Sequence, residues 1–328
     1  MAHGAFILAP KGSEVTDWER GFFKDADPWA FILFARNIDT PDQLRRLTND
    51  LRDTVGRDAL VLIDQEGGRV QRMRSPHWRE WLPPLDQAET AQDAARAFWL
   101  RYRIIADELR SVGIDANCAP TCDVAQPDTH PFLRNRCLGT DAATVIANAR
   151  ASAEGHLAGG VLPILKHMPG HGRGKVDSHL GLPVADVTLV EASVTDFAPF
   201  RALNDLPLGM SAHIVYPAMG DRPATQNPDM IRLIREEIGF NGLLMTDDIS
   251  MEALNGTVDQ RGLVSLQAGC DVVLHCNGEA AEMEAIAKSC GQMSEAAMTR
   301  AEAAMACRKT PEPVDIEAIE AELNALLA

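Results

Sequence analysis

The chain has 328 residues, of which 46% are hydrophobic and 24% are charged, as in ordinary soluble globular proteins. Its 31 Lys and Arg are outnumbered by 47 Asp and Glu, which gives a formal net charge of −16. This balance argues against a nucleic-acid-binding protein and against a polybasic membrane-surface protein, because both depend on clustered basic side chains. Disorder, collagen and coiled coil are also excluded as descriptions of the whole chain.

Short apolar runs recur along the chain, and each is followed by polar or glycine-rich residues and then by a helix-like pattern. The runs lie at 5–8, 30–34, 59–63, 114–119, 161–165, 208–211, 242–246 and 271–275. Nearly continuous apolar runs of this length are typical of parallel strands that are covered on both faces. Helices are expected between them, over 41–55, 91–112, 141–158, 228–238 and 260–268. Eight strand–helix units predict an α/β fold, a closed (β/α)8 barrel, more than an open doubly wound sheet.

We expect one domain, because no linker, repeat or low-complexity segment interrupts the pattern before residue 280. The predicted barrel spans residues 1–280. Residues 281–328 are rich in Ala and Glu and contain Pro311 and Pro313, so this tail is expected to form helices that pack on the barrel.

The cysteines and the N-terminal segment favour a reduced, cytoplasmic protein. The seven cysteines are odd in number and scattered, which argues against a disulfide framework. Cys118 and Cys122 are not followed by a second pair at zinc spacing. The first apolar run has no basic residues before it and stops at Pro10, too early for a signal peptide or a membrane span.

Polar side chains follow several of the predicted strands, at the end of a barrel where active sites are built. The third run leads into a segment that starts with Asp64, and the fifth ends in Lys166-His167. The remaining polar positions of this kind are His213, Asp247, Asp248 and His275. Polar residues at five strand ends predict a catalytic rim.

The densest polar segment is the loop KHMPGHGRGKVDSH at 166–179. Asp177 lies two residues before His179, close enough for its carboxylate to accept a hydrogen bond from the imidazole. Such a pair suits proton transfer near neutral pH, although an Asp–His hydrogen bond that only holds the loop together gives the same pattern. His171 is interpreted as a structural residue of the loop.

Asp247 is the first carboxylate after the seventh run and is expected to face the mouth of the barrel. A carboxylate fixed there can trap a cationic carbon, as the nucleophile of a retaining glycosidase does. Asp248 is expected to be the N-cap of the next helix, and Asp248 as nucleophile is kept as an alternative.

Five segments together resemble glycoside hydrolase family 3, in its bacterial β-N-acetylglucosaminidase branch of the NagZ type. They are IDQEGGRVQR at 63–72, RCLGTD at 136–141, KHMPGHG at 166–172, VDSH at 176–179 and TDDISM at 246–251. The chain departs from many relatives at Cys137-Leu138 and at Arg173-Gly174-Lys175.

The resemblance implies an enzyme that needs no metal and no other cofactor. Asp247 would be the nucleophile and His179 the proton donor and acceptor, supported by Asp177. Residues that would hold the N-acetylglucosamine ring are Asp64, Arg72, Arg136, Lys166 and His167. The implied substrate is a small cell-wall fragment, N-acetylglucosamine β-1,4-linked to anhydro-N-acetylmuramic acid with or without its peptide, cleaved by a monomer in the cytoplasm during peptidoglycan recycling.

Three alternatives stay open. A metal-dependent hydrolase on the same barrel would use His167, His213, His275 and Asp247 as ligands. A sugar-binding protein without turnover would keep the barrel alone. Within the same family, the specificity could be that of a glucosidase or xylosidase.

Overall fold

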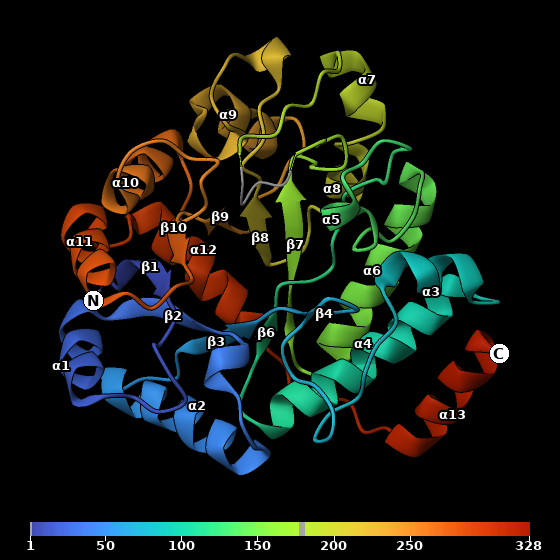
Figure 1. Ribbon diagram of the computed structural model, residues 1–328, viewed down its shortest axis with the longest axis horizontal. Coiled ribbons are helices and arrows are strands. Elements are labelled where there is room, and N and C mark those ends of the chain that lie inside the picture. Colours follow the sequence, from blue (N-terminus) through green and yellow to red (C-terminus); the bar gives the residue numbers. More distant parts are fainter. Residues whose placement is uncertain (1, 177–180) are drawn as a thin grey trace.

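The computed structural model describes residues 2–176 and 181–328 and contains a closed barrel of parallel strands surrounded by helices (Figure 1). Around the described barrel the strands follow the order β1-β10-β9-β8-β7-β6-β3-β2. Their bounds are β1 (Gly4–Leu8), β2 (Pro28–Leu33), β3 (Leu60–Ile63), β6 (Ala116–Asn117), β7 (Leu162–Met168), β8 (Leu208–Ser211), β9 (Leu243–Asp248) and β10 (Val272–His275). Each predicted run overlaps one of these strands, so the predicted (β/α)8 fold is confirmed.

The barrel strands are apolar on both faces because each face has its own layer to fill. In β1, Ile7 belongs to the apolar cluster that fills the barrel, whereas Phe6 and Leu8 pack in the layer between strands and helices. Met245 and Leu244 divide in the same way on β9. Successive side chains of a strand point to opposite faces, so two apolar layers require an almost continuous apolar run.

The predicted helices are present with small shifts of their ends. Helices that occur between strands are α1 (Asp17–Ala26), α2 (Pro41–Val55), α3 (Pro84–Thr90), α4 (Ala94–Ser111), α5 (Pro131–Arg134), α6 (Ala142–Ala158), α7 (Leu189–Val194), α8 (Ala198–Ala202), α9 (Pro228–Glu236) and α10 (Val258–Ala268). At the start of α2 the Thr40 side chain accepts a hydrogen bond from the backbone N–H of Gln43, and Pro41 is the first helical residue. The helix ends at Gly56 in the left-handed conformation.

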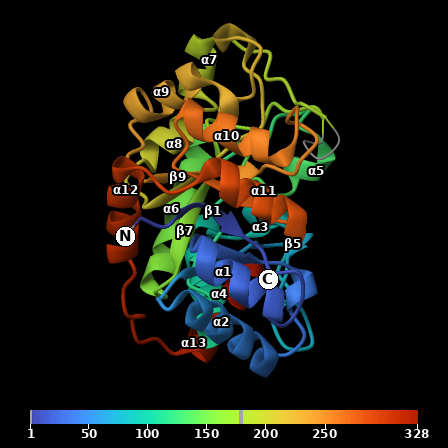
Figure 2. The same cartoon turned by 90° about the vertical axis from the view of Figure 1, so that its left-hand side faces the viewer.

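Three helices follow the last strand: α11 (Ala280–Cys290), α12 (Glu295–Ala306) and α13 (Ile316–Leu327). Ala297, Ala301 and Ala304 of α12 join the apolar cluster inside the barrel. The N–H of Met293, just before α12, donates to the carbonyl of His3 at 2.8 Å, so α12 covers the end of the barrel where the strands begin. Figure 2 shows α12 and α5 on opposite sides of the molecule.

Helix α13 packs on α4 through a small apolar cluster that includes Leu100, Ile104, Ile319 and Leu323. The division of the chain at residue 280 into a barrel and a tail stays a prediction. None of the helices in the described part of the chain is long and apolar enough to cross a membrane.

Candidate active site

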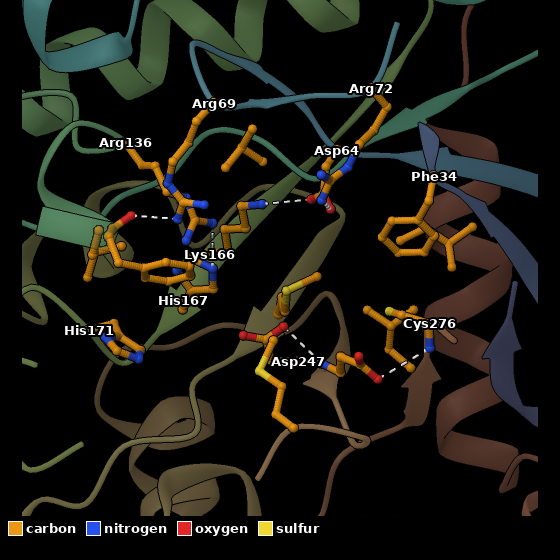
Figure 3. A pocket seen from close by; sticks show the side chains of 18 residues that line it. Phe34, Asp64, Arg69, Arg72, Arg136, Lys166, His167, His171, Asp247 and Cys276 are labelled. Carbon is orange, nitrogen blue, oxygen red and sulfur yellow. Dashed lines mark hydrogen bonds and ion pairs between the residues drawn. The ribbon is translucent and has the colours of Figure 1, made fainter. Parts of the chain in front are cut away.

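A cavity of about 430 Å³ opens at the carboxyl ends of the barrel strands (Figure 3). It is lined by Ile32, Phe34, Asp64, Arg69, Val70, Arg72, Phe132, Leu133, Arg136, Lys166, His167, His171, Met210, Asp247, Asp248, Met251, Leu274 and Cys276. The set contains every described residue that the resemblance assigns to catalysis or to the sugar ring, but not His213 or His275. Asp177 and His179 lie outside the described residues.

An alternating chain of charged side chains forms one wall of the cavity. Asp64 accepts from the Arg72 guanidinium at 2.9 Å and from the Lys166 ammonium at 3.0 Å. Lys166 Nζ also lies 2.5 Å from Glu66 Oε1. Glu66 in turn binds Arg136 through two hydrogen bonds, of 2.9 and 2.8 Å. Each of these cations is thus held in place by a carboxylate of the same chain of side chains rather than by a flexible surface residue.

These groups are all ionised at neutral pH. Burial raises the pKa of the Asp64 and Glu66 carboxyls, but the neighbouring cations outweigh it. The pKa of Asp64 therefore lies well below its usual range, and that of Glu66 falls to about 2. Burial opposes the charge of Lys166, yet the two carboxylates raise its pKa. The wall thus presents fixed donors and acceptors, which suits the hydroxyl groups of a sugar.

His167 adds an imidazole to this wall. Its Nδ1 lies 2.7 Å from Asp123 Oδ2, and its Nε2 lies 3.3 Å from Arg136 Nη2. Asp123 also accepts the backbone N–H of His171 at 2.6 Å. Burial raises the pKa of Asp123, but the two histidines outweigh it and keep the carboxyl ionised.

Asp247 lies at the end of β9 and, like Asp248 but unlike Asp64, forms no ion pair with a basic side chain among the described residues. Its Oδ1 accepts the backbone N–H of Asp248 at 2.8 Å. Burial raises its pKa, but nearby His167 and His213, that N–H group and Lys166 together lower it. An ionised carboxylate that no cation neutralises is suited to attack an electrophilic carbon.

The prediction that Asp248 caps the next helix is wrong, because α10 begins after Thr257. The Asp248 carboxylate accepts from the backbone N–H of Ser250 at 3.1 Å and from its hydroxyl at 2.6 Å. It also accepts the N–H of Cys276 at 3.3 Å. These bonds close a turn at the strand end and leave Asp247 as the freer carboxylate.

His213 and His275 were both expected at the catalytic rim, and the structure separates them. His213 Nε2 lies 3.0 Å from the backbone oxygen of Asp248, and its Nδ1 lies 2.9 Å from Thr225 Oγ1. His275 instead points toward the helix layer, where its Nε2 lies 2.8 Å from Glu282 Oε2. Within residues 2–176 and 181–328, no three His, Cys, Asp or Glu side chains are grouped so that they could hold a metal ion.

The two departures from the family pattern both have local partners. Arg136 is held by Glu66 through the paired bonds described above, and Cys137 and Leu138 are buried in apolar clusters. Arg173 donates to Asp196 at 2.8 Å, and Lys175 pairs with Asp128. The loop is therefore tied to its surroundings up to the point where the described residues stop.

Sequence reasoning missed several residues of this site. Glu66 lies two residues after Asp64, a spacing that indicates the same side of an extended chain, but its buried ion pairs depend on distant residues. Asp123 carries no local signal, because His167 meets it only through the fold. Phe34 and Cys276 also line the cavity, and the Phe34 ring centroid lies 5.3 Å from the Arg72 guanidinium carbon (Figure 3).

Comparison with known proteins places these residues in a family context. Residues 17–306 match the protein family described as "Glycosyl hydrolase family 3 N terminal domain". A beta-hexosaminidase of Methylobacillus flagellatus is 34% identical over 84% of this chain and 81% of its own length. One of Methylococcus capsulatus is 37% identical over 81% of this chain and 80% of its own. The structure of NagZ from Neisseria gonorrhoeae in complex with N-trifluoroacetyl-D-glucosamine is similar with a TM-score of 0.88, at 26% identity over 100% of this chain and 99% of that one.

Proposed function

Because the chain belongs to glycosyl hydrolase family 3, we propose that it is a retaining β-N-acetylhexosaminidase. Its substrate would be N-acetylglucosamine β-1,4-linked to anhydro-N-acetylmuramic acid, with or without a stem peptide. Two relatives of similar length are beta-hexosaminidases, and a protein of the same fold binds an N-acylated glucosamine. We further propose that it acts as a monomer in the cytoplasm on such soluble fragments.

The observation that carries the proposal is Asp247 at the end of β9, ionised, without an ion-pair partner among the described residues and beside the charged wall of the cavity. In the first step an Asp247 oxygen bonds to the anomeric carbon while the bond to the leaving-group oxygen breaks, and His179 gives that oxygen its proton. In the second step water attacks the same carbon, His179 takes up the proton, and Asp247 leaves. Two inversions give overall retention.

The charged wall would hold the sugar ring during both steps. Asp64 offers acceptor oxygens, whereas Arg72, Arg136 and Lys166 offer donors, two of which buried Glu66 holds in place. Because these groups already bind one another, they need little reorganisation when hydroxyl groups arrive. Asp177 would keep His179 oriented and stabilise its charged form.

Hydrolysis of 4-nitrophenyl N-acetyl-β-glucosaminide, compared with the β-glucoside, tests the specificity. We expect a clear preference for the N-acetylated substrate. Preference for the glucoside or xyloside would refute the proposed specificity for N-acetylglucosamine. Loss of activity on exhaustive chelation would instead support a metal-dependent hydrolase.

A fluorinated N-acetylglucosaminyl donor that traps the covalent intermediate tests the mechanism. Peptide mass mapping should find the label on Asp247. Label on Asp248, or no label in an active enzyme, would refute the assignment.

The role of His179 is tested by His179→Ala. This change should slow substrates with poor leaving groups by about 10²- to 10⁴-fold. Substrates with very good leaving groups should still glycosylate Asp247. Equal slowing of both kinds of substrate would show that His179 is not the acid.

A further inference from the structure

We propose that Asp123 is a positioning residue that holds the His167 imidazole in a single tautomer and, with the same carboxylate, anchors the turn that leads into the 173–176 segment. Asp123 follows β6 and is fully buried. The kinetic part of this inference rests on the proposed function, because it takes His167 to contact the sugar. The position of the proton on His167 follows from geometry alone.

The tautomer follows from the two neighbours of the His167 ring. An ionised Asp123 carboxylate can only accept, so His167 Nδ1, at 2.7 Å from Oδ2, must carry the hydrogen. A guanidinium can only donate, so Nε2, at 3.3 Å from Arg136 Nη2, must carry the lone pair. Both neighbours therefore require the same form. In that form the ring presents a hydrogen-bond acceptor on the side where Arg136 and the cavity lie.

The second Asp123 oxygen holds the backbone of the following turn. Oδ1 accepts the N–H of His171 at 2.6 Å, and the imidazoles of His167 and His171 lie edge to face with centroids 5.9 Å apart. Just beyond, Gly172 packs directly against Val124, where a Cβ on the glycine would lie 2.0 Å from the Val124 carbonyl oxygen. One carboxylate thus couples a sugar-facing ring to the chain that leads into the catalytic loop.

The partners of Asp123 distinguish it from a carboxylate that only stabilises the fold. Asp123 has no Lys or Arg ion-pair partner among the described residues and instead accepts hydrogen bonds from the His167 ring and from backbone N–H groups. A buried anion opposite an imidazole is the arrangement by which proteins fix the tautomer of a functional histidine. Buried Asp196, in contrast, pairs with the Arg173 side chain of the same loop and accepts no hydrogen bond from a histidine within residues 2–176 and 181–328.

The test is an NMR measurement of the protonation of each His167 ring nitrogen in ¹⁵N-histidine-labelled protein, with His167→Ala to identify the signals. We expect Nδ1 to be protonated and Nε2 to be unprotonated in the unmodified chain. Asp123→Asn keeps an oxygen for the His171 N–H but turns an amide donor toward Nδ1, which opposes a hydrogen there, while Arg136 still opposes one on Nε2. The two neighbours then no longer favour the same form, and the signals should show a mixture of tautomers in place of the single Nδ1-protonated form. Asp196→Asn is the matched control and should leave the His167 signals unchanged.

Kinetics provide the second arm. Asp123→Asn should lower kcat/KM by about 10- to 100-fold, as is usual when the partner of a functional histidine is lost. In a His167→Ala background, Asp123→Asn should have almost no further effect on kcat/KM, because the imidazole that Asp123 positions is absent. Fully multiplicative losses, or a wild-type His167 protonated on Nε2, would overturn the proposal. If the chain does not cleave the N-acetylglucosaminide at all, the proposed function fails, and the NMR arm still decides the tautomer.

Discussion

Glu66 offers the most quantitative test of the charged wall. Its carboxylate is buried between Lys166 and Arg136, and its pKa falls from the ordinary value of 4.5 to about 2. At about 1.4 kcal/mol per pH unit, this difference corresponds to about 3 kcal/mol of stability. Because the folded pKa is the lower one, the stabilisation is complete above pH 4.5 and is lost as the pH falls toward 2. Glu66→Gln should therefore cost about 3 kcal/mol at pH 7, in the range expected when a buried pair is broken.

Urea unfolding at pH 7 measures this loss. The matched control is Glu322→Gln on α13, which removes an exposed carboxylate that binds Arg96 at 2.7 and 2.9 Å. An exposed pair contributes less than about 1 kcal/mol, so the control should stay close to the unmodified chain. If Glu66→Gln costs no more than the control, the buried charges do not stabilise one another as inferred. The same variant should raise KM for the 4-nitrophenyl substrate, because the glutamine amide keeps one acceptor oxygen and Arg136 loses one of its two bonds.

Three other changes have defined outcomes. Asp247→Asn should lower kcat at least about 10⁴-fold, as expected for a lost nucleophile, with the free energy of urea unfolding changed by less than about 1 kcal/mol; more than a hundredth of the activity would contradict the role. Gly172→Ala should destabilise the fold by about 1 to 3 kcal/mol, since the new Cβ would lie 2.0 Å from the Val124 oxygen, whereas Gly12→Ala meets nothing within 4 Å and should be neutral. Burial lowers the pKa of His156 from 6.5 to about 3. Between these two pH values, the His156 imidazole is protonated in the unfolded chain but neutral in the folded chain. Stability should fall by about 1.4 kcal/mol per pH unit from this group between pH 6 and 4, and His156→Gln should flatten the profile by that amount; an unchanged slope would refute the assignment.

The barrel strands could be predicted because their signal is local. Two apolar layers impose continuous apolar runs, and each run corresponds to an observed strand. Helix α1 was missed, although Thr16 forms a capping box with Glu19. Gly21 in its centre and the short distance between β1 and β2 hid the helical period. The antiparallel pair β4 (Gln65–Gly67) and β5 (Val70–Gln71) was also missed, because Gly67 and Gly68 made the segment resemble a loop.

The site residues could be predicted from the sequence only where a polar residue directly follows an apolar strand. Asp64, Lys166 and Asp247 follow that rule and meet in one cavity. His275 follows it in sequence but faces outward, because the alternation of side chains places its neighbour Leu274 toward the cavity. A shift of one residue in the strand end exchanges the side chains that face the cavity with those that face the helices, and residue spacing alone does not fix this register. Pairings such as Glu66 with Arg136 join residues far apart in the chain and exist only after folding.

The barrel closes where β1 pairs with β10, the first strand of the chain with the last. During synthesis one edge of β1 therefore stays unpaired until β10 has left the ribosome. The cavity residues extend along the chain from Ile32 to Cys276, so no shorter N-terminal fragment contains a complete site. An interrupted translation product of this protein would accordingly be inactive and would expose the unpaired strand edge to aggregation.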